Sequence, residues 1–135
     1  MYSYFNPNPR SRRVGDCVVR ALSKATDKSW EEIYIELCLL GYIMGDLPSS
    51  NKVWDNYLKT QGFTRHIVTA ECLDCYTIND FFFFFPQGIY VIGTGSHAVC
   101  VIDGTIFDTW QSGDETPIYY YHKGDLWIVD DADSA

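Results

Sequence analysis

The dipeptide Asp103-Gly104 is the feature that most constrains how this chain folds. It separates two runs, SHAVCVI and TIFDTW, in which β-branched and aromatic residues dominate. Asp-Gly between such runs is a strong signal for a two-residue hairpin turn, because both turn positions need a positive φ that these residues tolerate. The sequence therefore predicts an antiparallel hairpin in which Ile102 pairs with Thr105.

Other segments of the second half share the period-two pattern of strands. The runs IYVIGTG and IYYYHK are rich in aromatic and β-branched residues and are bounded by Gly, Ser or charged residues. A short strand is also expected at 63–69. The run LWIV at 126–129 is expected to add an edge strand, and the acidic residues 130–135 to form a disordered tail.

Three helices are predicted ahead of these strands. The first begins near Asp16, which is expected to cap it, and continues through CVVRALSKA, where apolar residues recur with helical spacing. The pattern Ser29-x-x-Glu32 is typical of a capping box and predicts a second helix. A third helix should start at Ser49 or Ser50 and end before Gly62. The buried stripe of the second helix is expected to hold either Ile33, Leu37, Leu40 and Met44, or Trp30, Ile33 and Leu37.

Two further segments complete the prediction. Thr77-x-x-Asp80 resembles a helix start and Pro86 a helix stop, so the five phenylalanines between them are expected in a short helix packed on more than one side. Residues 1–12 contain Asn-Pro twice and are expected to be irregular, because proline removes a donor and restricts the residue before it. The whole pattern indicates an α+β fold, with a single domain over 1–129 in which helices precede an antiparallel sheet.

The charge of the chain is unevenly distributed. The net charge is −8, yet residues 1–28 carry six basic and two acidic groups, a balance of +4, and residues 29–135 carry four basic and sixteen acidic groups, a balance of −12. An acidic body disfavours nucleic acid as a partner, since phosphate contacts dominate that affinity.

The compartment can also be inferred from the sequence. No run of 18 apolar residues predicts a membrane span, and MYSYFNPNPRSRR lacks the apolar region of a secretory signal. We therefore expect a cytoplasmic protein. The five cysteines form an odd set and are expected to be reduced.

His97 and Asp108 are expected to be neighbours on one face of the predicted hairpin. Side chains alternate between faces along a strand, so His97 and Val99 share a face with Asp108 and Trp110. The register pairs Val99 with Asp108, which places His97 and Asp108 diagonally, about 7–8 Å apart at the backbone. A carboxylate there can accept a hydrogen bond from the imidazole and fix its tautomer. Trp110, opposite His97, would shield that bond from water.

Cys17 is the strongest candidate nucleophile. It lies at the expected start of the first helix, where free N–H groups and the helix dipole favour a thiolate, and an arginine-rich segment precedes it. Cys38 and Cys100 are expected to be small buried hydrophobic residues, since Cys38 lies in an apolar helical run and Cys100 alternates away from His97.

Cys72 and Cys75 form a single CxxC pair. A second ligand pair at the spacing of a zinc site is absent, so the sequence predicts no metal and no other cofactor.

Cysteine at the start of the first long helix, then histidine on one strand and an acid on the next, is the order found in papain-like cysteine peptidases. Asp108-Thr109-Trp110 is similar to the Asn-Ser-Trp of that superfamily, and Gly15-Asp16-Cys17 ahead of an apolar helix resembles small bacterial and phage-borne members, the double-glycine-leader type included. The resemblance implies a papain-like fold, a catalytic triad of Cys17, His97 and Asp108, and a peptide or protein substrate. It implies hydrolysis of peptide or amide bonds, or acyl transfer.

The resemblance also implies an oxyanion hole. The superfamily places a Gln about six residues before the Cys, where this chain has Ser11, so Asn8 or Asn6 is expected to supply that donor beside the Cys17 N–H.

Two other functions fit parts of the sequence. A papain-like fold without catalysis could bind a partner through the aromatic run Tyr119, Tyr120 and Tyr121. A redox module could use Cys72 and Cys75 if they lay beside a helix N-terminus.

Overall fold

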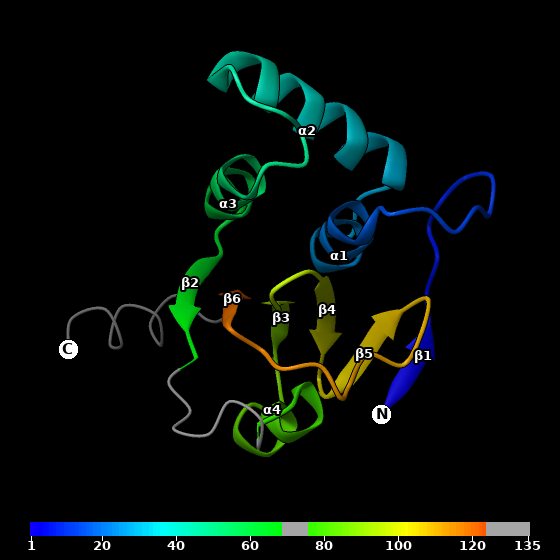
Figure 1. The fold of residues 1–135 in the computed structure, drawn as a ribbon, viewed down its shortest axis with the longest axis vertical. Coiled ribbons are helices and arrows are strands. Elements are labelled where there is room, and N and C mark those ends of the chain that lie inside the picture. The colour runs from blue at the N-terminus through cyan, green and yellow to red at the C-terminus, as the bar shows by residue number, and fades with distance from the viewer. Residues whose placement is uncertain (69–75, 124–135) are drawn as a thin grey trace.

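A computed structural model describes residues 1–68 and 76–123, which form a six-stranded sheet with helices on both faces (Figure 1). The helices are α1 (Cys17–Thr26), α2 (Trp30–Met44), α3 (Asn51–Thr60) and α4 (Ile78–Phe84). The strands are β1 (Tyr2–Tyr4), β2 (Thr64–Ile67), β3 (Ile89–Gly93), β4 (Ala98–Ile102), β5 (Thr105–Asp108) and β6 (Tyr119–Lys123). The α+β class expected from the sequence is therefore observed.

The predicted hairpin is formed by β4 and β5, which are neighbours in a sheet whose strand order is β1-β5-β4-β3-β6-β2. Ile102 pairs with Thr105, as expected. Asp103 and Gly104 both have positive φ, 48° and 81°, which is the requirement of a tight type I′ turn. The register of β4 and β5, on which the prediction of the site depends, is therefore confirmed.

The expectation of a purely antiparallel sheet is wrong at one edge. Residues 2–4 form β1, which pairs in parallel with β5, although this segment was expected to be irregular. Ile106 donates its backbone N–H to the Met1 carbonyl and Phe5 donates to the Asp108 carbonyl. The prolines at 7 and 9 follow the strand, so they remove no donor from this ladder.

The helices begin where their capping residues predict. The Ser29–Glu32 capping box is present at α2, and the Ser50 side chain accepts a hydrogen bond from the Lys52 N–H at the start of α3. Asp16 stands at the N-cap position of α1, but its side chain makes no capping hydrogen bond. The expected capping role of the Asp16 carboxylate is therefore wrong, because the carboxylate bonds to side chains instead.

Two apolar clusters lie on opposite faces of the sheet. One packs α1, α2 and α3 against the strands and includes Leu22, Ile33, Trp54 and Cys100. The other packs α4 against Val99, Val101, Ile106 and other residues of the opposite face. Figure 1 shows the same arrangement, with α4 on the other side of the strands from α1.

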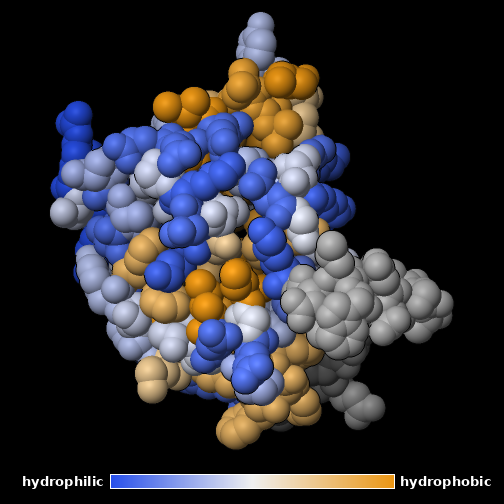
Figure 2. All heavy atoms as spheres, turned by 180° about the vertical axis from the view of Figure 1, so that it is seen from behind, coloured by the Kyte–Doolittle hydropathy of each residue, from blue (hydrophilic) through white to orange (hydrophobic). Residues whose placement is uncertain are grey.

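Helix α2 uses a narrow part of its apolar surface for the core. Ile33 and Leu37 are buried as expected and Leu40 is half-buried, but Met44 is exposed. Figure 2 shows apolar side chains gathered at the end of the molecule where α2 lies. The exposed large apolar and aromatic residues of α2 and the turn after it are Tyr34, Ile35, Leu39, Tyr42, Ile43, Met44 and Leu47.

The phenylalanine run forms a helix as predicted, with a Thr77–Asp80 capping box. The expectation that it packs on more than one side is wrong. Phe81 is fully buried, whereas Phe83 and Phe84 are 83% and 68% exposed. One turn of helix can direct only part of five consecutive residues at the sheet, and the others face away.

This difference gives a stability test with a matched control. Phe81→Ala is expected to reduce the free energy of unfolding by about 3–5 kcal/mol, because it empties a buried aromatic site. Phe83→Ala, the same change on the same helix, is expected to stay within about 0.5 kcal/mol of the wild type. Urea unfolding measures both. Equal losses for the two variants would contradict the orientation of α4.

Several expectations fall outside the described residues: the strand at 126–129, the tail at 130–135 and the Cys72/Cys75 pair. Among the helices of the described ranges, none combines the length and apolar character needed to cross a membrane. The run IYYYHK was expected to be a strand, and its residues 119–123 form β6, which lies inside the sheet between β3 and β2.

Candidate active site

Cys17 is the first residue of α1, and α1 packs against β4. Its thiol is half-buried and lines the same cleft as His97 and as Ala98, the first residue of β4. Cys17 is therefore at the start of the first helix, as the sequence suggested, and the structure adds that this helix start lies beside β4.

His97 directly precedes β4 and Asp108 ends β5. The His97 Nε2 lies 2.6 Å from the Asp108 Oδ2, and the two side chains are 10% and 1% exposed. The Trp110 ring lies 5.2 Å from the imidazole, centroid to centroid, at an interplanar angle of 41°. The structure thus brings together the three residues that the hairpin register placed side by side.

The Asp108 carboxylate is held by four partners. Its Oδ2 receives Ser112 Oγ at 2.8 Å in addition to His97. Its Oδ1 accepts the Thr109 backbone N–H at 2.7 Å and the Arg20 guanidinium at 3.1 Å. Because a carboxylate has about four lone-pair positions, this one has no freedom to rotate away from the imidazole.

The thiol and the imidazole shift each other's protonation. Burial alone would raise the pKa of Cys17, but the hydrogen bonds with His97 and with the Ala98 N–H, and the nearby charges of His97 and Arg20, bring that pKa below its ordinary value. Burial alone would lower the pKa of His97, but its hydrogen bonds with Asp108 and then Cys17 raise that pKa to about 9. Both shifts favour the pair of thiolate and imidazolium over the pair of neutral thiol and neutral imidazole.

The pKa of Asp108 is lowered, which favours a carboxylate beside the imidazolium. Burial of this carboxyl would raise its pKa, but the hydrogen bonds from His97 and Ser112 lower it. Asp108 therefore stays ionised where it faces the imidazole.

Asp16, Arg20 and Ser112 were not predicted as parts of this site. Arg20 bonds through Nη1 to the Asp16 Oδ1 and through Nη2 to Asp108, and the Trp30 indole donates to the Asp16 Oδ2 at 2.9 Å. Opposite charges at 16 and 20, one helical turn apart, are a sequence signal for their pairing. Ser112 carries no comparable signal, because it follows β5 in an irregular segment.

The three candidates for an oxyanion donor differ in placement. Asn6 is engaged on both sides within its own loop, donating to the Arg12 carbonyl at 3.1 Å and accepting from the Asn8 N–H at 3.2 Å. Ser11 is exposed with φ of 56°, and neither Asn6 nor Ser11 lines the cleft beside Cys17. Asn8 does line it.

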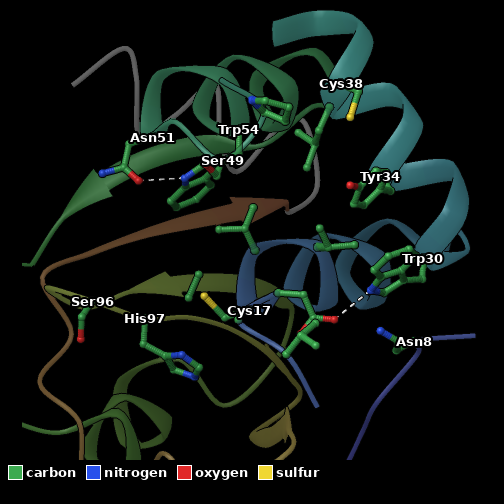
Figure 3. Close-up of a pocket in the computed structure, with 18 of the residues that line it drawn as sticks. Asn8, Cys17, Trp30, Tyr34, Cys38, Ser49, Asn51, Trp54, Ser96 and His97 are labelled. Carbon is green, nitrogen blue, oxygen red and sulfur yellow. Dashed lines mark hydrogen bonds between the residues drawn. The ribbon is translucent and has the colours of Figure 1, made fainter. Parts of the chain in front are cut away.

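The cleft has a volume of about 850 Å³. Figure 3 shows Cys17 and His97 at one end, with Trp30, Tyr34 and Cys38 of α2 along another wall. Ser49, which precedes α3, lines a further part together with Asn51 and Trp54 of α3. Its size and mixed lining suit an extended organic ligand.

The remaining described thiols differ from Cys17. Cys38 was expected to be a buried core residue, and this is wrong, because it is half-buried and lines the cleft. Cys100 is buried as expected, and burial raises its pKa well above the ordinary value. A thiol in that environment is unreactive. Across residues 1–68 and 76–123, no group of three His, Cys, Asp or Glu side chains is arranged to hold a metal ion.

The tyrosine run does not present an exposed interface. Tyr121 is buried, Tyr119 lines the cleft, and Tyr120 packs against Phe81. The binding-module hypothesis therefore gains no support from these residues.

Comparison of the chain with protein-family models, curated proteins and solved structures finds no match in any of the three.

Proposed function

We propose that the chain is a papain-like cysteine peptidase, or a related thiol-dependent amide hydrolase or acyl transferase, with Cys17 as nucleophile. The observation that carries this proposal is the Cys17–His97–Asp108 arrangement at the end of a cleft, with a buried carboxylate 2.6 Å from the imidazole. A papain-like fold is supported by the helix that starts at the nucleophile and packs on the strand next to the histidine.

The proposed reaction follows from the protonation states. The Cys17 thiolate attacks the carbonyl carbon of a peptide or amide, forming a C–S bond while the carbonyl electrons move to the oxygen. The N–H of Cys17 and the Asn8 amide are the proposed donors to that oxyanion. His97 then gives its proton to the departing nitrogen as the C–N bond breaks.

The acyl-enzyme is resolved by the same imidazole. His97, now neutral, takes a proton from water or an acceptor amine, which attacks the thioester carbon. The C–S bond breaks and the thiolate returns beside the imidazolium. Throughout, Asp108 keeps the histidine oriented and stabilises its positive charge.

Alkylation of the thiols tests the proposal without a known substrate. At about pH 6, iodoacetamide is expected to modify Cys17 much faster than the other four cysteines, because the thiolate is the reacting species. Cys38, half-buried in the same cleft, is the internal control. Peptide mass spectrometry after timed quenching gives each rate.

The His97→Ala variant is expected to lose the advantage of Cys17, since its thiolate then has no imidazolium partner. Equal rates at all five cysteines, or an unreactive Cys17, would overturn the enzyme proposal. Fast reaction of Cys72 and Cys75 with reversible oxidation would favour the redox module instead.

A further inference from the structure

Arg20 joins the two halves of the proposed site. Cys17 lies on α1, whereas His97 and Asp108 lie at the ends of β4 and β5. Arg20 is on α1, three residues after Cys17, and its Nη2 bonds to the Asp108 Oδ1 at 3.1 Å. One guanidinium therefore connects the helix that carries the nucleophile to the carboxylate that orients the base.

The connection is anchored at its other end. The Arg20 Nη1 bonds to Asp16, the residue before Cys17, and to the Val14 carbonyl at 3.4 Å. Asp16 in turn accepts the Trp30 indole N–H at 2.9 Å from α2. The Arg20 and Asp16 side chains are each 6% exposed, so this chain of bonds is shielded from water.

The charges of the cluster are suited to positioning. Asp16 balances the Arg20 charge, so Asp108 remains available to stabilise a positive imidazole. A buried ion pair is in general a poor source of stability, because desolvation offsets the attraction. The ion pair lies between the nucleophile and the base, and this location suits it to hold the two in a fixed relative position.

We propose that Arg20, held by Asp16, is a positioning residue that fixes the Cys17 sulfur relative to the His97–Asp108 pair. The guanidinium fork reaches both carboxylates at once, which a single ammonium cannot do in the same geometry. Loss of the fork lets α1 shift against the β4–β5 hairpin, and the sulfur loses its alignment with the imidazole. The proposal rests on the proposed function, since it concerns the same thiolate.

The test is the pH dependence of Cys17 alkylation by iodoacetamide. The titratable or charged groups that act on this thiol include His97 before β4, Arg20 on α1 and Tyr119 on β6. In Arg20→Lys the midpoint of the alkylation profile is expected to move about one pH unit toward that of an ordinary thiol. Alkylation at about pH 6 then falls roughly tenfold, as the thiolate fraction falls.

Two other variants sharpen the result. Asp16→Asn combined with Arg20→Gln removes both charges but keeps hydrogen-bonding groups. It is expected to show the same shift of the midpoint, and it replaces Arg20→Lys in the test if that variant does not fold. Lys24→Gln removes a positive charge from the same helix, where Lys24 contacts Phe5 and Phe107, and should leave the midpoint unchanged.

The outcomes separate the two proposals. A wild-type Cys17 that titrates as an ordinary thiol overturns the proposed function and the positioning role together. A second outcome is a lowered midpoint in the wild type and the same lowered midpoint in folded Arg20 variants, whose melting temperature alone decreases. This outcome overturns the positioning role but not the proposed function. A shift in the Arg20 variants without a shift in Lys24→Gln supports it.

Discussion

Replacing Asp108 by asparagine is expected to slow acylation of Cys17 about 10⁴-fold, because the variant favours the wrong tautomer of His97. Asparagine stands at this position in the Asn-Ser-Trp stretch that Asp108-Thr109-Trp110 resembles, but in this chain the Oδ1 position faces two donors. These are the Thr109 N–H and Arg20, and they favour the asparagine oxygen at that position. The amide NH₂ then faces the His97 Nε2, which can only accept. The remaining imidazole proton lies on Nδ1, and the ring cannot take a proton from the thiol.

The burst of nitrophenolate from a nitrophenyl ester measures this acylation rate. Ser112→Ala is the matched control, because it removes one hydrogen bond to the same carboxylate but keeps the charge. It is expected to cost about tenfold at most. Melting temperatures of both variants establish that they are folded. If Asp108→Asn acylates as fast as Ser112→Ala, Asp108 does not orient His97.

Amide cleavage by the wild-type protein is expected to fall roughly tenfold for each pH unit above the pKa of His97. That pKa is raised to about 9, chiefly by the hydrogen bond with Asp108, so the imidazolium persists up to this pH and is lost beyond it. The departing amine needs the imidazolium proton, whereas alkylation by iodoacetamide needs only the thiolate. Cleavage should therefore decline in alkaline solution while alkylation does not.

A library of peptide anilides supplies the amide substrate for this comparison. In His97→Gln the cleavage rate is expected to drop about 10⁶-fold, and the remaining rate should have no decline at that pH. Two outcomes would show that a group other than His97 causes the alkaline decline in cleavage. One is a decline that persists in His97→Gln, and the other is alkylation that falls together with cleavage in the wild type.

The features that were predictable are those encoded locally. Asp103-Gly104 determines its own turn and, through the period of two, which side chains share a face with His97. The capping boxes at Ser29 and Thr77 place helix starts from four residues each. The His97–Asp108 contact was predictable for the same reason, because the position of the turn determines which residues of the two hairpin strands lie next to each other.

The features that were missed depend on contacts between distant segments. The parallel pairing of β1 with β5 joins residues about a hundred positions apart, and three residues of strand carry too little pattern to show it. The role of Arg20 was missed because its contact with Asp108 joins residues 88 positions apart in the sequence. Cys38 lies in an apolar run, and only the packing of α2 against α1 and α3 decides that it borders the cleft.

The ionisation of Cys17 tests the central proposal most directly. Thiolate absorbance in the ultraviolet, recorded across pH for the wild type and subtracted from that of Cys17→Ser, isolates the titration of this one sulfur. The proposed site predicts a midpoint below that of an ordinary thiol, and a return to the ordinary range in His97→Ala. A Cys17 that titrates in the ordinary range in the wild type, or one that is unaffected by His97→Ala, would contradict it.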